Sequence, residues 1–213
     1  MATLTDPAFQ LLLARLFSDA ERTQREFHEE RRALLAEGFQ QGSPPYAAAA
    51  RKAHLAITPE TGELLYLLAR LREARTIVEF GTSFGVSTLH LAAALRDNGG
   101  GRLIATETEP TKAEAARRTL AEAGVDDLVE ILLGDARETL RAKRPRPVDL
   151  LFLDGPGHLY VDVLKLLEPD LSPTAVIVAD NAEARGYRTY LETHDHYVSV
   201  SFGTRVEVTL LSD

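Results

Sequence analysis

The sequence of 213 residues contains no cysteine. Disulfide bonds, zinc sites built from thiolates and catalysis by a thiol nucleophile are therefore excluded. It also lacks an apolar run approaching 18 residues, so it predicts no membrane-spanning helix. The N-terminus has an acid and a proline before its first apolar run and no basic segment, which is not typical of a signal peptide. We therefore expect a cytoplasmic protein.

A surplus of positive charge is missing as well. The chain has 32 Asp and Glu residues against 24 Lys and Arg, which gives a net charge of −8 at pH 7. Proteins that bind nucleic acid normally present a basic face to the phosphates, so we expect neither a nucleic-acid partner nor a membrane partner. The length and the 45% hydrophobic content fit one globular domain with a small extension.

The N-terminal quarter of the chain has a helical pattern. Residues 7–38 are predicted helical, with a second, highly charged helix over 19–37. A Gly-Ser-Pro-Pro break at 42–45 is followed by an alanine-rich stretch, a short helix or an ordered loop. We divide the chain into an N-terminal helical extension, residues 1–56, and a main domain, residues 57–213.

The main domain alternates short apolar runs with helix-like segments. Thr58 is placed to cap a helix that has Pro59 at its first position. The buried side of this helix is expected to carry Leu64, Leu65, Leu67, Leu68 and Leu71. Strands are predicted at 76–80, 103–106, 129–133, 149–153 and 175–179, and helices at 87–96, 112–123, 137–143 and 159–167.

This alternation predicts an α/β fold. Continuous apolar strands separated by helices form a doubly wound, Rossmann-like parallel sheet that is covered on both faces. Strands at 197–202 and 205–211, joined by a two-residue loop, add an antiparallel hairpin at the end. The expected sheet is therefore mostly parallel and seven-stranded.

A glycine turn follows the first strand. Gly81 permits a tight turn, and Gly85 allows a ligand to approach the backbone. Ser87 lies in the first turn of the next helix, whose free N–H groups suit a carboxylate or a phosphate. Ligands of open α/β sheets bind at the carboxyl ends of the strands.

Acids also end the next two strands. Glu107 lies about 20 residues after Gly85, the spacing at which an acid accepts the ribose hydroxyls of a nucleotide. Gly134, Asp135 and Ala136 end the third strand, where an adenine edge is within reach. These positions indicate a cofactor that contains adenosine, although ordinary polar strand ends remain an alternative.

A third group of polar residues ends the fourth and fifth strands. Asp154 follows one strand, and Asp180 and Asn181 follow the other. Oxygen ligands on adjacent strand ends suit a hard cation such as Mg²⁺ or Ca²⁺. The alternative is that Asp180 and Asn181 cap the following helix.

Four segments carry a resemblance to a known family: IVEFGTSFGVSTLHLAAAL, LIATETEP, DLLFLDG and AVIVADN. Together with the lead-in ITPETGELLYLLARL, they resemble motifs of the class I S-adenosylmethionine-dependent methyltransferases, in particular the cation-dependent catechol and caffeoyl-CoA O-methyltransferases. The Gly-x-Gly-x-x-Gly motif of dinucleotide folds is absent. The resemblance covers roughly residues 57–211.

The resemblance implies an enzyme that methylates a small phenolic or catechol-like acceptor. A divalent cation held by Asp154, Asp180 and Asn181 would bind the acceptor and lower the pKa of one hydroxyl, and the resulting oxyanion would attack the sulfonium methyl group. The resemblance implies that S-adenosylmethionine is bound by Glu79, Gly81, Thr82, Ser83, Gly85, Ser87, Glu107, Gly134, Asp135, Ala136 and Asp154.

The sequence departs from the family pattern at the general base. The family usually has a lysine three residues after the first metal-binding aspartate, and here Gly157 occupies that position. His158 is adjacent, and an imidazole is able to take a phenolic proton near neutral pH. A surface or capping histidine is the alternative.

Two further regions are of interest by analogy with related enzymes. The N-terminal helices are expected to form a homodimer or a lid over the acceptor. The segment with Tyr46, Arg51, Lys52 and His54 closes over the acceptor in related enzymes, so it is expected to set specificity for the acceptor. The His194-Asp195-His196 triplet has metal-binding atoms but precedes the hairpin, where polar turn residues are common. Two other functions remain open: a methyltransferase of this fold with a vestigial metal site and a non-diol acceptor, and a nucleotide-cofactor oxidoreductase or non-catalytic binder.

Overall fold

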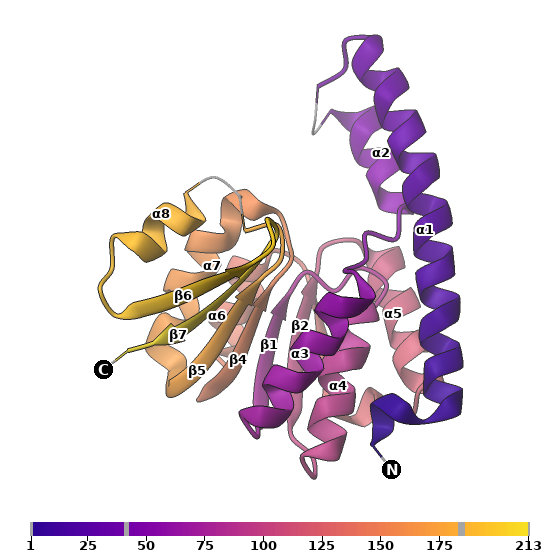
Figure 1. Ribbon diagram of the computed structural model, residues 1–213. Coiled ribbons are helices and arrows are strands. Elements are labelled where there is room, and N and C mark those ends of the chain that lie inside the picture. The colour runs from indigo at the N-terminus through magenta and orange to yellow at the C-terminus, as the bar shows by residue number, and fades with distance from the viewer. Residues whose placement is uncertain (1, 41–42, 183–185, 213) are drawn as a thin grey trace.

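The computed structural model describes residues 2–40, 43–182 and 186–212. They form a central seven-stranded sheet with helices packed on both faces (Figure 1). Six strands lie within one residue of their predicted bounds, and β5 begins four residues before its predicted start. The strands are β1 (Thr76–Phe80), β2 (Arg102–Glu107), β3 (Val129–Leu133), β4 (Val148–Leu153), β5 (Leu171–Ala179), β6 (Tyr197–Phe202) and β7 (Val206–Leu211).

The helices and short 3-10 turns connect these strands. The helices are α1 (Pro7–Ala36), α2 (Pro44–Lys52), α3 (Pro59–Leu71), α4 (Val86–Asp97), α5 (Pro110–Glu122), α6 (Ala136–Lys143), α7 (Tyr160–Leu167) and α8 (Tyr187–Glu192). The 3-10 turns are Thr3–Thr5, Asp126–Leu128, Gly157–Leu159 and Glu168–Asp170. Among the described helices, none has the length and apolar character that a membrane span requires.

The sheet has the strand order β3-β2-β1-β4-β5-β7-β6. Strands β1 to β5 pair in parallel, whereas β7 pairs antiparallel with β5 and β6. The predicted fold class, a mostly parallel Rossmann-like sheet with a terminal antiparallel hairpin, is confirmed. The order reverses between β1 and β4, and the crevice at the carboxyl ends of these two strands is where doubly wound folds bind ligands.

Two hydrophobic cores lie on opposite faces of the sheet. One packs α1, α3, α4 and α5 against one face, and the other packs α6, α7 and α8 against the opposite face. Figure 1 shows the first group on one side of the strands, while the far end of α1 and α2 project beyond the sheet. A small separate cluster of Phe27, Ala49 and Ala53 holds α1 and α2 together.

Three sequence predictions about local structure are wrong. The N-terminal segment forms one 30-residue helix, because no glycine or proline interrupts it and Arg22 pairs with Asp19 and Glu26 along its surface. The loop between β6 and β7 has three residues, 203–205, since Phe202 pairs with Val206.

The third error concerns the leucines of α3. The predicted cap is confirmed, because Thr58 Oγ1 accepts a hydrogen bond from the Thr61 N–H at 3.2 Å. However, Leu65 is fully buried while Leu67 and Leu71 are 54% and 82% exposed. A helix against a sheet buries a stripe narrower than the leucine pattern suggests.

Candidate cofactor and cation site

A cavity lies at the point where β1 and β4 separate. Gly81 begins the turn after β1 with a φ of +100°, and a Cβ there would be 2.6 Å from the backbone oxygen of Asp154. Glycine is therefore required by both the backbone conformation and the close approach of the two strand ends. The residues that line the cavity are His54, Leu55, Ala56, Ile57, Thr82, Ser83, Phe84, Val86, Ser87 and Asp154.

Glu79 lies fully buried beneath this turn. Its carboxylate accepts hydrogen bonds from Ser87 Oγ at 2.5 Å and from Thr88 Oγ1 at 2.6 Å. Burial raises the pKa of Glu79 to about 7, although the two hydroxyl groups act in the opposite direction. Ser87, in the first turn of α4, therefore donates its hydroxyl hydrogen bond to Glu79 in this structure.

Glu107, at the end of β2, faces the same turn. Its carboxylate accepts hydrogen bonds from the Ser83 N–H at 2.8 Å and from the backbone N–H groups of Thr108 and Glu109. Thr82 is buried and hydrogen-bonds to the backbone oxygen of Thr106. The acid predicted from spacing therefore lies beside the glycine turn.

Asp135 has a structural partner at the end of β3. Its carboxylate caps α6 by accepting from the Arg137 N–H at 2.8 Å, and the guanidinium of Arg137 binds both oxygens. The Arg137 side chain lowers the pKa of Asp135 to about 2. Gly134 has a φ of +132°, and Ala136 is buried at the start of the helix.

Asp154 and Asp180 end adjacent strands. Burial and then the charge of Asp180 raise the pKa of Asp154 well above its usual value. Asp180 is 3% exposed, and its Oδ2 accepts from Arg205 Nη2 at 3.0 Å and from Asn181 Nδ2 at 3.3 Å. The three predicted metal ligands are therefore neighbours, and a guanidinium already faces one of them.

His158, the predicted general base, is more exposed than Asp154 and Asp180. His158 is exposed on the 3-10 turn Gly157–Leu159, which follows β4. Among the described residues, no group of three or more histidine or acidic side chains forms a ready-made metal site. The metal-ligating groups at the ends of β4 and β5 are the carboxylates of Asp154 and Asp180 and the side-chain amide of Asn181.

Sequence reasoning singled out His54 and Arg51 but missed Phe84 and Lys112, which lie beside them at the cavity. The His54 ring stacks on Phe84 with centroids 3.5 Å apart, and the ammonium of Lys112 lies 5.6 Å from the Phe84 ring centre. Arg51 forms an ion pair with Glu109 at 3.0 Å. An aromatic residue inside the glycine turn was the one available signal, since the positions of Arg51 and Lys112 depend on tertiary packing.

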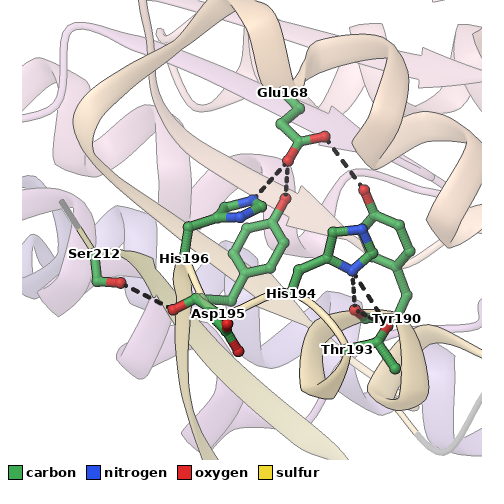
Figure 2. Close-up of polar contacts among 8 residues, drawn as sticks. Glu168, Tyr190, Thr193, His194, Asp195, His196 and Ser212 are labelled. Atoms are coloured by element: carbon green, nitrogen blue, oxygen red, sulfur yellow. Dashed lines mark hydrogen bonds and ion pairs between the residues drawn. The ribbon is translucent and has the colours of Figure 1, made fainter.

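The histidine triplet lies elsewhere. His196 Nε2 is 2.9 Å from a carboxylate oxygen of Glu168, which also accepts from Tyr197 OH at 2.7 Å. His194 Nδ1 instead contacts the backbone oxygen of Tyr190 at 2.7 Å (Figure 2). The two imidazoles have different partners. This cluster is at the amino end of β5 and β6, opposite the cavity.

Comparisons with known proteins agree with this geometry. A family model described as a methyltransferase domain matches residues 78–182. The crystal structure of the O-methyltransferase TomG from Streptomyces achromogenes, in complex with S-adenosylmethionine, is 32% identical with a TM-score of 0.67 and covers 75% of this chain and 82% of TomG. The chain belongs to the S-adenosylmethionine-dependent O-methyltransferase family.

Curated relatives of this chain point to the same family. A catechol O-methyltransferase from Mycobacterium tuberculosis is 36% identical over 147 residues, and one from Niastella koreensis is 35% identical over 130 residues. These matches cover 69% and 60% of this chain, and they span less than two thirds of the relatives' own lengths, 66% and 58%. The predicted family resemblance is confirmed.

Proposed function

We propose that this chain methylates a hydroxyl group of a small catechol-like or other phenolic acceptor. S-adenosylmethionine is the methyl donor, and a divalent cation binds the acceptor. The observation that carries the proposal is the cavity between the glycine turn and Asp154, at the strand-order reversal. The names of the catechol O-methyltransferase relatives support the acceptor class.

The proposed cofactor contacts follow the edge of the sheet. The glycine turn (Gly81, Thr82, Ser83 and Gly85), Ser87 and Asp154 surround the amino-acid part of the cofactor. Glu107 accepts hydrogen bonds from the ribose hydroxyls. To do so, its carboxylate would have to give up some of its present hydrogen bonds from backbone N–H groups. The stretch from Gly134 through Asp135 to Ala136 borders the adenine, and Glu79 supports the turn from below.

The donor set at Asp154, Asp180 and Asn181 fits a hard cation, because every available ligand atom is an oxygen. Burial and then the charge of Asp180 raise the pKa of Asp154, and a cation would relieve the repulsion between the two carboxylates. When bound, the cation would lower the pKa of the acceptor hydroxyl and orient it. Asn181 would have to present its carbonyl oxygen, since its amide nitrogen now faces Asp180.

A second candidate rests on the ion pair between Arg205 and Asp180. In this alternative the guanidinium supplies the positive charge, the metal site is vestigial and the acceptor is not a vicinal diol. Arginine is a permanent cation with a planar array of donors, so it is able to hold an anionic oxygen without metal.

A methyl-transfer assay with a panel of catechols and simple phenols separates the two candidates. The first predicts that a chelator abolishes turnover, that Mg²⁺ restores it and that Asp154→Ala removes it. Turnover that is indifferent to the chelator and depends on Arg205 supports the second. The control is Asp127→Ala, which changes an exposed acid far from the cavity.

We propose His158 as the general base that replaces the family lysine. It follows β4 on an exposed turn, from which it would have to approach a bound acceptor. His158→Ala should lower the rate below pH 8 more than above it, since hydroxide replaces the base at high pH. An unchanged rate between pH 6 and pH 9 would exclude this role.

The N-terminal extension, residues 1–56, is proposed to form a homodimer or to cover the acceptor. The far half of α1 supports an interface, because Leu35 and nearby Phe39 are 45% and 39% exposed on the projecting segment. Light scattering of the wild-type chain and of Leu35→Glu distinguishes the two roles. A dimer that becomes monomeric in the variant supports the interface, and a monomer supports the lid.

A further inference from the structure

We propose that His54 is a cofactor-positioning residue that closes the amino-acid end of the cavity and hydrogen-bonds through Nδ1 to that part of S-adenosylmethionine. This inference rests on the proposed function. It assigns the segment before α3 to the cofactor, whereas the sequence suggested a role in acceptor choice.

The position of His54 supports this role. Its ring stacks on Phe84 inside the glycine turn, with centroids 3.5 Å apart and planes inclined by 18°. His54 and the three residues after it line the cavity together with Ser87 and Asp154. The imidazole is therefore a wall of the space between the N-terminus of α4 and the end of β4.

Two polar atoms at this cavity are buried without partners. His54 Nδ1 and Ser83 Oγ have no hydrogen bond within the described part of the chain. A buried polar atom without a partner loses its hydrogen bonds to water on folding, so each such atom calls for a partner such as a water or a ligand. Both belong to residues that border the same cavity, which indicates one polar ligand for both.

The chemistry of the cavity walls suits the amino-acid part of a cofactor. The N-terminus of α4 offers free N–H groups to a carboxylate, and Asp154 is able to accept from an ammonium group. Burial, with the nearby charges of Lys112 and Arg22, lowers the pKa of His54 in spite of Asp19. A neutral imidazole is able to accept from an ammonium group or to donate to a carboxylate, according to its tautomer.

The backbone of His54 is anchored on α1. Its N–H donates to Thr23 Oγ1 at 3.1 Å, and its carbonyl oxygen accepts from Gln24 Nε2 at 2.9 Å. The Lys112 ammonium also holds the adjacent segment by donating to the backbone oxygen of Ala50 at 3.3 Å. These contacts set the position of the ring before any ligand binds, which reduces the entropy lost on binding.

Calorimetry with two ligands tests the proposal. S-adenosylhomocysteine contains the amino-acid part, and 5′-methylthioadenosine lacks it. His54→Phe keeps an aromatic ring on Phe84 but removes Nδ1, and we expect it to weaken S-adenosylhomocysteine binding about tenfold or more. Its affinity for 5′-methylthioadenosine should stay within about twofold of wild type.

Two further variants serve as matched controls. The His54→Asn amide places a polar atom where Nδ1 stands, so it should restore most of the lost affinity. His28→Phe changes an exposed histidine of α1 and should bind both ligands as the wild type does. In wild-type protein, nitrogen-detected imidazole spectra should show the His54 Nδ1 signal shift on addition of S-adenosylhomocysteine, while the His28 signals stay in place.

The outcomes are distinguishable. Equal binding of S-adenosylhomocysteine by His54→Phe and wild type overturns the proposal, and so does an unmoved Nδ1 signal. A similar loss for both ligands means that the substitution disturbs the whole site and not one hydrogen bond to the amino-acid part, which also overturns the proposal. Failure of the wild type to bind S-adenosylhomocysteine at all overturns the proposed function, and this inference with it.

Discussion

The buried carboxyl of Glu79 makes the stability of this protein depend on pH in an unusual direction. Its pKa is raised from 4.5 to about 7 in the folded protein, chiefly by burial. A raised pKa means that the folded state holds the proton more tightly than the unfolded chain does. The stabilisation is fully present below pH 4.5 and is lost as the pH rises through about 7.

The size of the effect follows from the shift. One pKa unit corresponds to about 1.4 kcal/mol, so a rise of about 2.5 units gives about 3 kcal/mol between pH 4.5 and pH 8. Glu79→Gln keeps the shape and a hydrogen-bonding group for Ser87 and Thr88 while it removes the charge. We therefore expect the variant to be similar to wild type at pH 4.5 and more stable by about 3 kcal/mol at pH 8.

Urea unfolding of ligand-free protein at pH 4.5, 6, 7 and 8 measures the difference in free energy of unfolding between Glu79→Gln and wild type. Asp154 also has a raised pKa, but its contribution is present in both proteins and largely cancels. Glu63→Gln, at an exposed position on α3, is the control and should show no such trend. A difference that stays constant over this pH range would refute the reasoning.

Three other predictions concern stability. Leu89→Ala removes a fully buried side chain and should lower the free energy of unfolding, measured in urea, by about 2–5 kcal/mol. Leu67→Ala, at a half-exposed site, is the control and should lower it by less than about 1 kcal/mol. Gly81→Ala should cost more than about 1 kcal/mol and lower the Tm, because its Cβ would meet the Asp154 backbone at 2.6 Å; an unchanged Tm would contradict this. Glu168→Gln should lose about 1–3 kcal/mol at pH 7. Burial opposes ionisation of Glu168, but its hydrogen bonds leave its pKa below the usual value, so the loss should shrink as the pH falls below about 4; a loss that is equal at pH 7 and pH 3 would exclude this contribution.

Local patterns were sufficient for most of the secondary structure, apart from the single long α1, the start of β5 and the length of the hairpin loop. The apolar runs that became β1 to β4 have no competing interpretation, and Thr58 with Pro59 marks the start of α3 through a hydrogen bond within one turn. The glycine turn after β1 is equally local, because its backbone needs positive φ values at Gly81 and Gly85. These features depend on residues fewer than five positions apart, which is why the sequence alone determined them.

The tertiary structure decided which side chains meet. The Asp180 carboxylate faces Arg205 from the hairpin, and the ring of His54 lies on Phe84, 30 residues away in the chain. Leu67 is exposed although its neighbour Leu65 is buried, since the sheet accepts one stripe of α3. Such contacts depend on strand order and helix rotation, which are properties of the whole packed chain. The sequence by itself therefore determined the family, the elements and the acids at the strand ends, whereas packing decided the partner of each acid.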